Sequence, residues 1–166
     1  FPMFDNDRNI IGITKRHSNG EKSMVRQSKL GLILPDNLHE GDRLFVVEGV
    51  SDTAAGLDLG LPVIGRPNCN GIKDVIVDYA KKFSDVVIIA DNDPPGKLGA
   101  EHLQRTLRLY CPVVRVVCPP AGLKDLRQWV QAGLDRNSLN HYLKNVSEPG
   151  IHLSYELNRR RQQREN

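Results

Sequence analysis

Two short acidic segments each follow an apolar run, and their residue types suit chemistry on phosphate groups. They are Glu48-Gly49-Val50-Ser51-Asp52 and Asp91-Asn92-Asp93-Pro94-Pro95-Gly96. If both runs are strands of one parallel sheet, Glu48, Asp91 and Asp93 meet at its carboxyl edge, where open α/β sheets keep their ligand crevice. A few carboxylates, completed by waters and substrate phosphates, are the ligands that Mg²⁺ prefers. The spacing therefore predicts a magnesium site.

The elements that must position these acids are an alternation of strands and helices. Three apolar runs rich in β-branched residues are typical of strands buried on both faces, and they are residues 43–47, 85–90 and 113–117. Apolar residues recur at helical spacing in four further segments, which are residues 72–79, 100–110, 123–130 and 139–146. Such alternation predicts an α/β fold with a parallel sheet flanked by helices and right-handed crossovers.

A smaller β unit is expected ahead of this sheet. Residues 10–13 and 22–26 are separated by a polar turn segment, which predicts a β-hairpin. The length of 166 residues suits one α/β core with a small appendage. We therefore divide the chain into a basic hairpin subdomain (1–41), the α/β domain (42–135) and a helical C-terminal extension with a basic tail (136–166).

The charge of the chain is unevenly distributed although its net value is only +3. Between residues 8 and 29 a single acid, Glu21, is set against six basic residues, which are Arg8, Lys15, Arg16, Lys22, Arg26 and Lys29. This asymmetry predicts a polyanionic partner near the acidic site. A second basic run, residues 159–164, is more typical of a solvated, frayed tail.

The cysteine content points to a reducing compartment, and the hydropathy gives no sign of a membrane span. Cys69, Cys111 and Cys118 form no C-x-x-C pair, which argues against a disulfide framework and a structural zinc site. No apolar stretch reaches the length of a membrane span. We expect a cytoplasmic protein without a membrane partner.

Together the two acidic motifs resemble the Toprim domain, which bacterial-type DNA primases, type IA and type II topoisomerases, small recombination-repair proteins and certain nucleases share. The matching residues are Glu48, Gly49, Asp52, Asp91, Asp93 and Gly96. Residues 60–65 also resemble the second strand of the family and the glycine turn that follows it, so the resemblance implies a Toprim fold with a parallel sheet of about four strands. The resemblance extends from Arg43 to Ala132. The alternative is a generic doubly wound domain whose acids are helix N-caps, and Asp52 alone fits that description.

The resemblance implies a Mg²⁺ site, in which Mn²⁺ can substitute, formed by Glu48, Asp91 and Asp93. Glu48 has two possible roles in the family, metal ligand or general acid/base, and the sequence does not choose between them. Asp52 is a further candidate ligand. Gly49 and Gly96 are expected to let the backbone turn beside bound phosphate.

Residues 119–126 resemble the segment after the last core strand of primases, where a Lys-Asp or similar acidic pattern precedes a helix. Asp125 is therefore a candidate ligand for a second metal ion, and an N-cap role is the equal alternative. Many primases carry another acid two positions earlier, where this chain has Leu123. That departure puts a complete second acidic cluster in doubt.

The segment before the α/β domain resembles the basic strand region of bacterial, phage and plasmid primases. There, basic residues guide the template and the incoming nucleotides, and the matching positions are Arg16, Lys22 and Lys29. The partners implied are single-stranded DNA, nucleoside triphosphates and, in the parent system, a helicase.

The function that this resemblance favours is nucleotidyl transfer on a single-stranded template, as in RNA primer synthesis. A Toprim-type nuclease would use the same carboxylates for water attack on a phosphodiester. A noncatalytic DNA-binding Toprim module is the third possibility. Retention of Glu48, Asp91 and Asp93 argues against the binding-only alternative, whereas Leu123 keeps it open.

Overall fold

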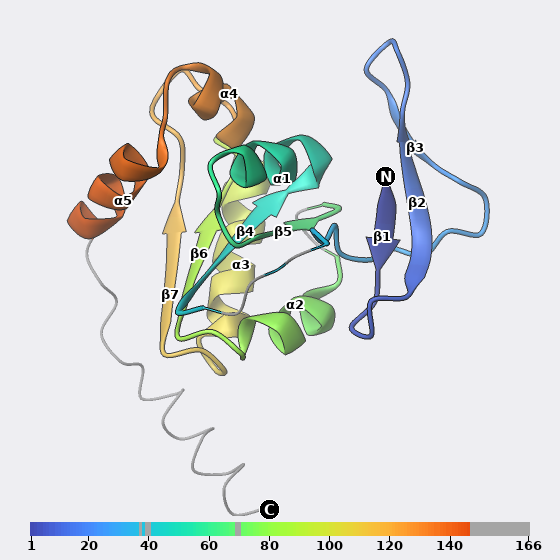
Figure 1. Ribbon diagram of the computed structural model, residues 1–166, viewed down its shortest axis with the longest axis horizontal. Helices are drawn as coiled ribbons and strands as arrows, with labels where there is room; N and C mark the ends of the chain where they lie inside the picture. The colour runs from blue at the N-terminus through green and yellow to red at the C-terminus, as the bar shows by residue number, and fades with distance from the viewer. Residues whose placement is uncertain (37, 39–40, 69–70, 147–166) are drawn as a thin grey trace, which may run out of the picture.

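The computed structural model describes residues 1–36, 38, 41–68 and 71–146, and its centre is a parallel four-stranded sheet in the order β5-β4-β6-β7 (Figure 1). The strands are β4 (Arg43–Glu48), β5 (Val63–Arg66), β6 (Asp85–Ile89) and β7 (Val113–Val117). The helices are α1 (Gly49–Asp58), α2 (Lys73–Ala80), α3 (Pro94–Leu107), α4 (Leu126–Gln131) and α5 (Arg136–Asn145). The predicted α/β fold is confirmed.

Helices cover both faces of this sheet, which explains why its strands are apolar throughout. Leu44 and Val46 of β4 lie in the buried cluster formed with α2 and α3. Phe45 and Val47 alternate with them and face the opposite cluster, which contains residues of α1, α4 and α5. Trp129 of α4 belongs to this second cluster and packs in the interface between this helix and the sheet.

The strand order creates a switch point between β4 and β6. The chain runs from β4 outward to β5 and then returns to place β6 on the other side of β4. Val46 is paired with Ile88, so Glu48 and Asp91 leave the sheet at nearly the same level. Connections after β4 and β6 therefore diverge, which is how doubly wound sheets form a ligand crevice.

The N-terminal sheet stands beside the larger one (Figure 1). It consists of β1 (Pro2–Phe4), β2 (Ile10–Arg16) and β3 (Lys22–Met24), all paired antiparallel. The predicted hairpin is β2–β3, whereas β1 was not expected because three residues carry no clear strand pattern. Leu32 pairs with Phe4 of β1, and the next residue, Ile33, pairs with Gly65 of β5. Two consecutive residues therefore join the two sheets.

Some details differ from expectation. Gly65 was expected in a turn but lies inside β5, where a Cβ atom would overlap Oγ1 of Thr53 and lie 3.0 Å from Cβ of Ile33. The helix α3 ends at Leu107, so Tyr110 follows it rather than belonging to it. Cys69, residues 37, 39 and 40 before the predicted boundary at 41, and the basic C-terminal run lie outside the described residues. Among the described helices none is long and apolar enough to cross a membrane.

Candidate active site

Glu48 ends β4 at the switch point and is placed by a tight turn into α1. The next residue, Gly49, has φ of +80°, a conformation that glycine adopts at little cost, so the predicted turn is confirmed here. Oε2 of Glu48 lies 3.6 Å from a guanidinium nitrogen of Arg66, which ends the neighbouring strand β5. Only 2% of the Arg66 side chain is exposed, so this cation orients Glu48 from inside the protein and does not reach the surface.

The second acidic segment turns from β6 into α3. Asp93 is the N-cap of α3, and its Oδ1 accepts a hydrogen bond of 2.8 Å from the backbone N–H of Gly96. Gly96 does not have positive φ. A Cβ atom there would lie 2.8 Å from Cβ of Asp91, so glycine is needed for close packing and not for the expected turn.

Asn92, between the two aspartates, fixes the loop that follows β7. Its backbone N–H donates to the carbonyl oxygen of Lys124 at 2.6 Å. Its side-chain amide donates to the carbonyl oxygens of Leu123 and Pro119, at 3.1 and 3.4 Å. The loop is therefore held against the Asp91–Asp93 segment by Asn92.

Asp125, which follows in this loop, is the N-cap of α4. Its Oδ1 accepts a hydrogen bond of 2.8 Å from the backbone N–H of Gln128, so the structure shows the capping role that was one of the two alternatives. Its Oδ2 lies 3.9 Å from a guanidinium nitrogen of Arg127.

Asp52 lies in the first turn of α1 but its carboxylate supports a different helix. The backbone N–H groups of Leu126 and Arg127 donate to its two oxygens at 3.2 and 3.4 Å. Its side chain is 2% exposed. Burial, followed by the negative charges of Asp125 and Asp91, raises the pKa of Asp52 from 3.8 to about 7. Asp52 thus links α1 to the start of α4 at a cost in charge burial.

Asp91 is the centre of the acidic cluster. Burial, then the charges of Glu48, Asp93 and Asp125, raise its pKa from 3.8 to about 6, and Lys124 opposes this rise. Its Oδ1 is buried, and no group of the described residues donates a hydrogen bond to it. A buried carboxylate oxygen without a donor, among like charges, is the environment that a cation would relieve.

The predicted ligands thus lie within electrostatic reach of one another, and they suit a divalent cation. Within the described ranges, no three His, Cys, Asp or Glu side chains are already arranged as a metal-binding group. Asp93 and Asp125 each use one oxygen as a helix cap. Glu48 and Asp91 are therefore the acids best disposed to receive a metal ion.

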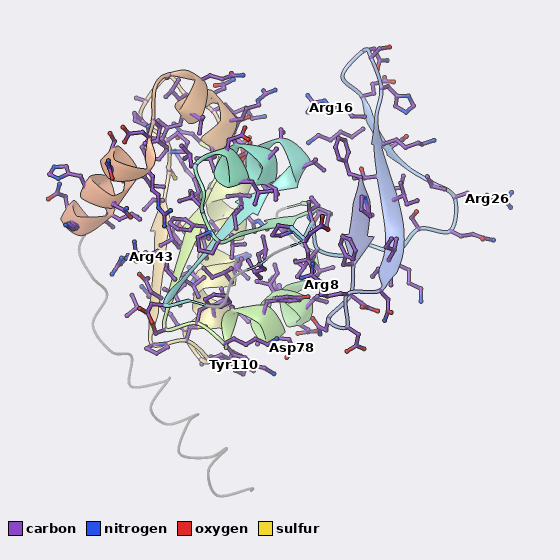
Figure 2. All side chains as sticks on the ribbon, in the orientation of Figure 1. Arg8, Arg16, Arg26, Arg43, Asp78 and Tyr110 are labelled. Atoms are coloured by element: carbon purple, nitrogen blue, oxygen red, sulfur yellow. The ribbon has the colours of Figure 1, made fainter. Side chains whose placement is uncertain are left out.

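The basic residues of the N-terminal sheet reach the same edge. A pocket between the sheets is lined by Arg16 and Lys22 on one side and by residues 49–51 on the other. A Cβ atom on Gly49 would lie 3.7 Å from Nζ of Lys22. Figure 2 shows Arg16 on the side facing α1 and Arg26 pointing away from the larger sheet. Lys29 is exposed beside Gly12 and does not line this pocket.

Three residues contribute to the site although the sequence did not single them out as site residues, and they are Arg66, Asn92 and Lys124. An arginine directly after the apolar residues 63–65 is a detectable signal, because a charge ending a buried strand needs a partner. Lys124 belongs to the Lys-Asp pattern of residues 119–126, but that pattern pointed to Asp125 and not to the lysine. Asn92 carries no signal of its role, which depends on how β6 and the loop after β7 meet.

Comparison with solved structures finds the same architecture in DNA primases. No family model and no curated protein matches the chain. A DNA primase domain from Pseudomonas aeruginosa superposes with a TM-score of 0.73 at 17% identity, covering 90% of this chain and 51% of that one. A DnaG primase catalytic domain bound to single-stranded DNA gives 0.70 at 20% identity, covering 89% and 51%. The chain shares the fold of these primase catalytic domains.

A phage protein shows the same likeness. The primase fragment of the bacteriophage T7 primase–helicase gives a TM-score of 0.60 at 17% identity, covering 85% of this chain and 61% of that one. At these identities the likeness establishes the fold. The chain spans about half the length of the bacterial primase structures.

Proposed function

We propose that this chain is a primase-type Toprim domain that performs metal-dependent nucleotidyl transfer on a single-stranded nucleic-acid template. The observation that carries the proposal is the convergence of Glu48, Asp91 and Asp93 at the switch point between β4 and β6, with a buried Asp91 oxygen that accepts no hydrogen bond from the described residues. A site of this kind attracts a cation and, through it, a phosphate.

Glu48 and Asp91 would hold Mg²⁺ or Mn²⁺, with Asp93 beside them. When bound, the metal would neutralise charge on the transferring phosphoryl group. Arg66 orients Glu48 through the 3.6 Å ion pair, and Asn92 keeps the loop after β7 closed against the acidic segment. Asp52 holds the start of α4, so its contribution to the site is positional; a direct metal contact by Asp52 would require its bonds to Leu126 and Arg127 to be exchanged.

Single-stranded DNA and nucleoside triphosphates are the proposed partners, with Arg16, Lys22 and Lys29 as phosphate contacts. Arg16 and Lys22 line the pocket beside Gly49, which supports a path for nucleic acid between the two sheets. One matching structure is a DnaG domain bound to single-stranded DNA, and another is a primase fragment of a primase–helicase. These likenesses support a helicase as a partner in the parent system.

Primer synthesis tests the proposal directly. The protein would be incubated with Mn²⁺, labelled ribonucleotides and a single-stranded DNA template, and products would be resolved on a gel. We expect weak, distributive incorporation, because correct positioning of template and nucleotide contributes much of the rate. Glu48→Gln and Asp91→Asn should abolish it, and Glu101→Gln, an exposed acid on α3, should not.

The same assay separates the alternatives. Cleavage of labelled DNA or RNA that depends on Glu48 and Asp91, without incorporation, would replace this proposal with a Toprim-type nuclease. Binding of single-stranded DNA without either activity, and without metal binding, would assign a noncatalytic module.

A further inference from the structure

Lys124 brings a positive charge to the acidic cluster. Its Nζ lies 3.8 Å from Oδ2 of Asp93. This separation exceeds a hydrogen bond, so the ammonium neutralises the carboxylate without being fixed to it. The side chain is 58% exposed, in contrast to the buried Arg66 that pairs with Glu48. Of these two cations, Lys124 is therefore the one that can also reach a ligand in the crevice.

The backbone of Lys124 is held firmly although its side chain is exposed. Its carbonyl oxygen accepts the 2.6 Å hydrogen bond from Asn92, and its N–H donates to Oε1 of Gln128 at 2.7 Å. Asn92 belongs to the acidic segment, and Gln128 to α4. The lysine is thus fixed at the junction of the two elements while its four-carbon stem stays free to turn.

From this geometry we propose that Lys124 is a phosphate-binding residue of the site, which neutralises Asp93 when no substrate is present and contacts a substrate phosphate when a metal ion occupies the acids. The inference rests on the proposed metal site. Lysine is a common phosphate ligand because its ammonium is a compact point charge with three donors. The phosphate belongs either to a nucleoside triphosphate or to a nucleic-acid backbone.

This role makes two predictions of opposite sign for Lys124→Met. Without substrate, a divalent ion no longer competes with the ammonium for the carboxylates, so Mn²⁺ should bind about two- to fivefold more tightly, the range expected for a partly exposed ion pair. With Mn²⁺ present, a phosphate ligand should bind about tenfold more weakly, because the variant cannot donate a charge-assisted hydrogen bond to it. Damage to the fold would weaken both.

Calorimetric titration at pH 7.5 measures each quantity, first with Mn²⁺ alone and then with saturating Mn²⁺ plus ATP or plus an oligothymidylate. Weaker binding of ATP alone would assign the contact to the triphosphate, and weaker binding of the oligonucleotide alone to the backbone. Lys124→Arg keeps the charge and should bind Mn²⁺ like the wild type. Lys81→Met is the matched control, because Lys81 is 53% exposed and also pairs with an aspartate, Asp78, but on α2.

Two results would overturn the inference and leave the proposed function standing. They are unchanged or weaker Mn²⁺ binding by Lys124→Met, and tighter Mn²⁺ binding with unchanged affinity for both phosphate ligands. If the wild type itself binds no Mn²⁺, the metal site fails and this inference fails with it.

Discussion

Asp91 destabilises the metal-free protein at neutral pH, because its charged carboxylate is buried among other acids. Its pKa is raised to about 6 by burial and by Glu48, Asp93 and Asp125, so the charged form is unfavourable in the metal-free protein. A carboxyl whose folded pKa lies above its unfolded value contributes stability at low pH and loses it as the pH rises. The window for Asp91 therefore runs from about pH 4 to about pH 6.

We predict that Asp91→Asn stabilises the metal-free protein at pH 8 by about 1–2 kcal/mol, because the variant has no charge to bury. Urea unfolding in EDTA at pH 4.5 and pH 8 would measure this. The wild type should lose stability between these values, and the variant should lose less. Asp52, whose pKa of about 7 lies in the same range, accounts for a remaining slope. Asp36→Asn, an exposed loop acid, should change little, and equal slopes for Asp91→Asn and wild type would contradict the prediction.

At the scale of elements, the first turn of α4 is stabilised by two acids from different parts of the chain. Asp125 caps its first turn, and Asp52 of α1 accepts from the N–H groups of Leu126 and Arg127. Four N–H groups at a helix start lack partners within the helix, and these two side chains supply acceptors for three of them. The short helix therefore depends on both.

Replacing Asp125 separates capping from metal binding. Serine also caps helices, so Asp125→Ser should be about 1 kcal/mol more stable than Asp125→Ala, while both remove the charge. Thermal unfolding with and without Mn²⁺ would measure each variant. Mn²⁺ that binds the folded protein should raise its Tm. We expect this rise to be retained in Asp125→Ser, because the Asp125 carboxylate is engaged by Gln128 and Arg127. Disappearance of that rise would instead make Asp125 a metal ligand.

Gly65 allows β5 to lie against α1 and the segment containing Ile33. We predict that Gly65→Ala destabilises the protein by about 1–3 kcal/mol, because its Cβ would overlap Oγ1 of Thr53. Thr53→Ala in the same chain should recover part of the loss, a coupling that a double-mutant cycle in urea would measure. Gly41→Ala, with open space around it, is the control. Full additivity of the two changes would argue against this contact.

The strands and acids could be predicted from the sequence because their signals are local. Apolar β-branched runs located β4, β6 and β7 nearly to the residue, and the acids follow these runs directly. Capping of α4 by Asp125 was one of two alternatives that the sequence left open. The bonds from α4 to Asp52, the Asn92 clamp and the ion pair of Lys124 could not be predicted, because each joins segments that are distant in the chain.

At the scale of the whole molecule, the two sheets are coupled through one short segment. Leu32 exchanges backbone hydrogen bonds of 2.8 and 2.9 Å with Phe4, and Ile33 exchanges bonds of 2.8 and 2.9 Å with Gly65. Asn6 adds a 2.6 Å hydrogen bond to Asp78 of α2. These contacts set the N-terminal sheet so that Arg16 and Lys22 line the pocket at the start of α1, next to Glu48. Figure 2 shows Arg16 on this side of the sheet.

This arrangement predicts that the effect of removing a basic residue on binding of single-stranded DNA depends on which way that residue faces. Removing one phosphate-binding cation should flatten the slope of log affinity against log salt by about 0.7, so Arg16→Ala with Lys22→Ala should flatten it by about 1.4. Fluorescence anisotropy of an oligothymidylate over a series of salt concentrations would measure the slope, and Lys29→Ala tests the third proposed phosphate-binding residue. Arg26→Ala is the matched control, because Arg26 belongs to the same basic segment of the sequence but points away from the larger sheet (Figure 2). If Arg26→Ala flattens the slope as much as the double variant does, nucleic acid binds the hairpin through its overall charge and does not follow the pocket toward Glu48.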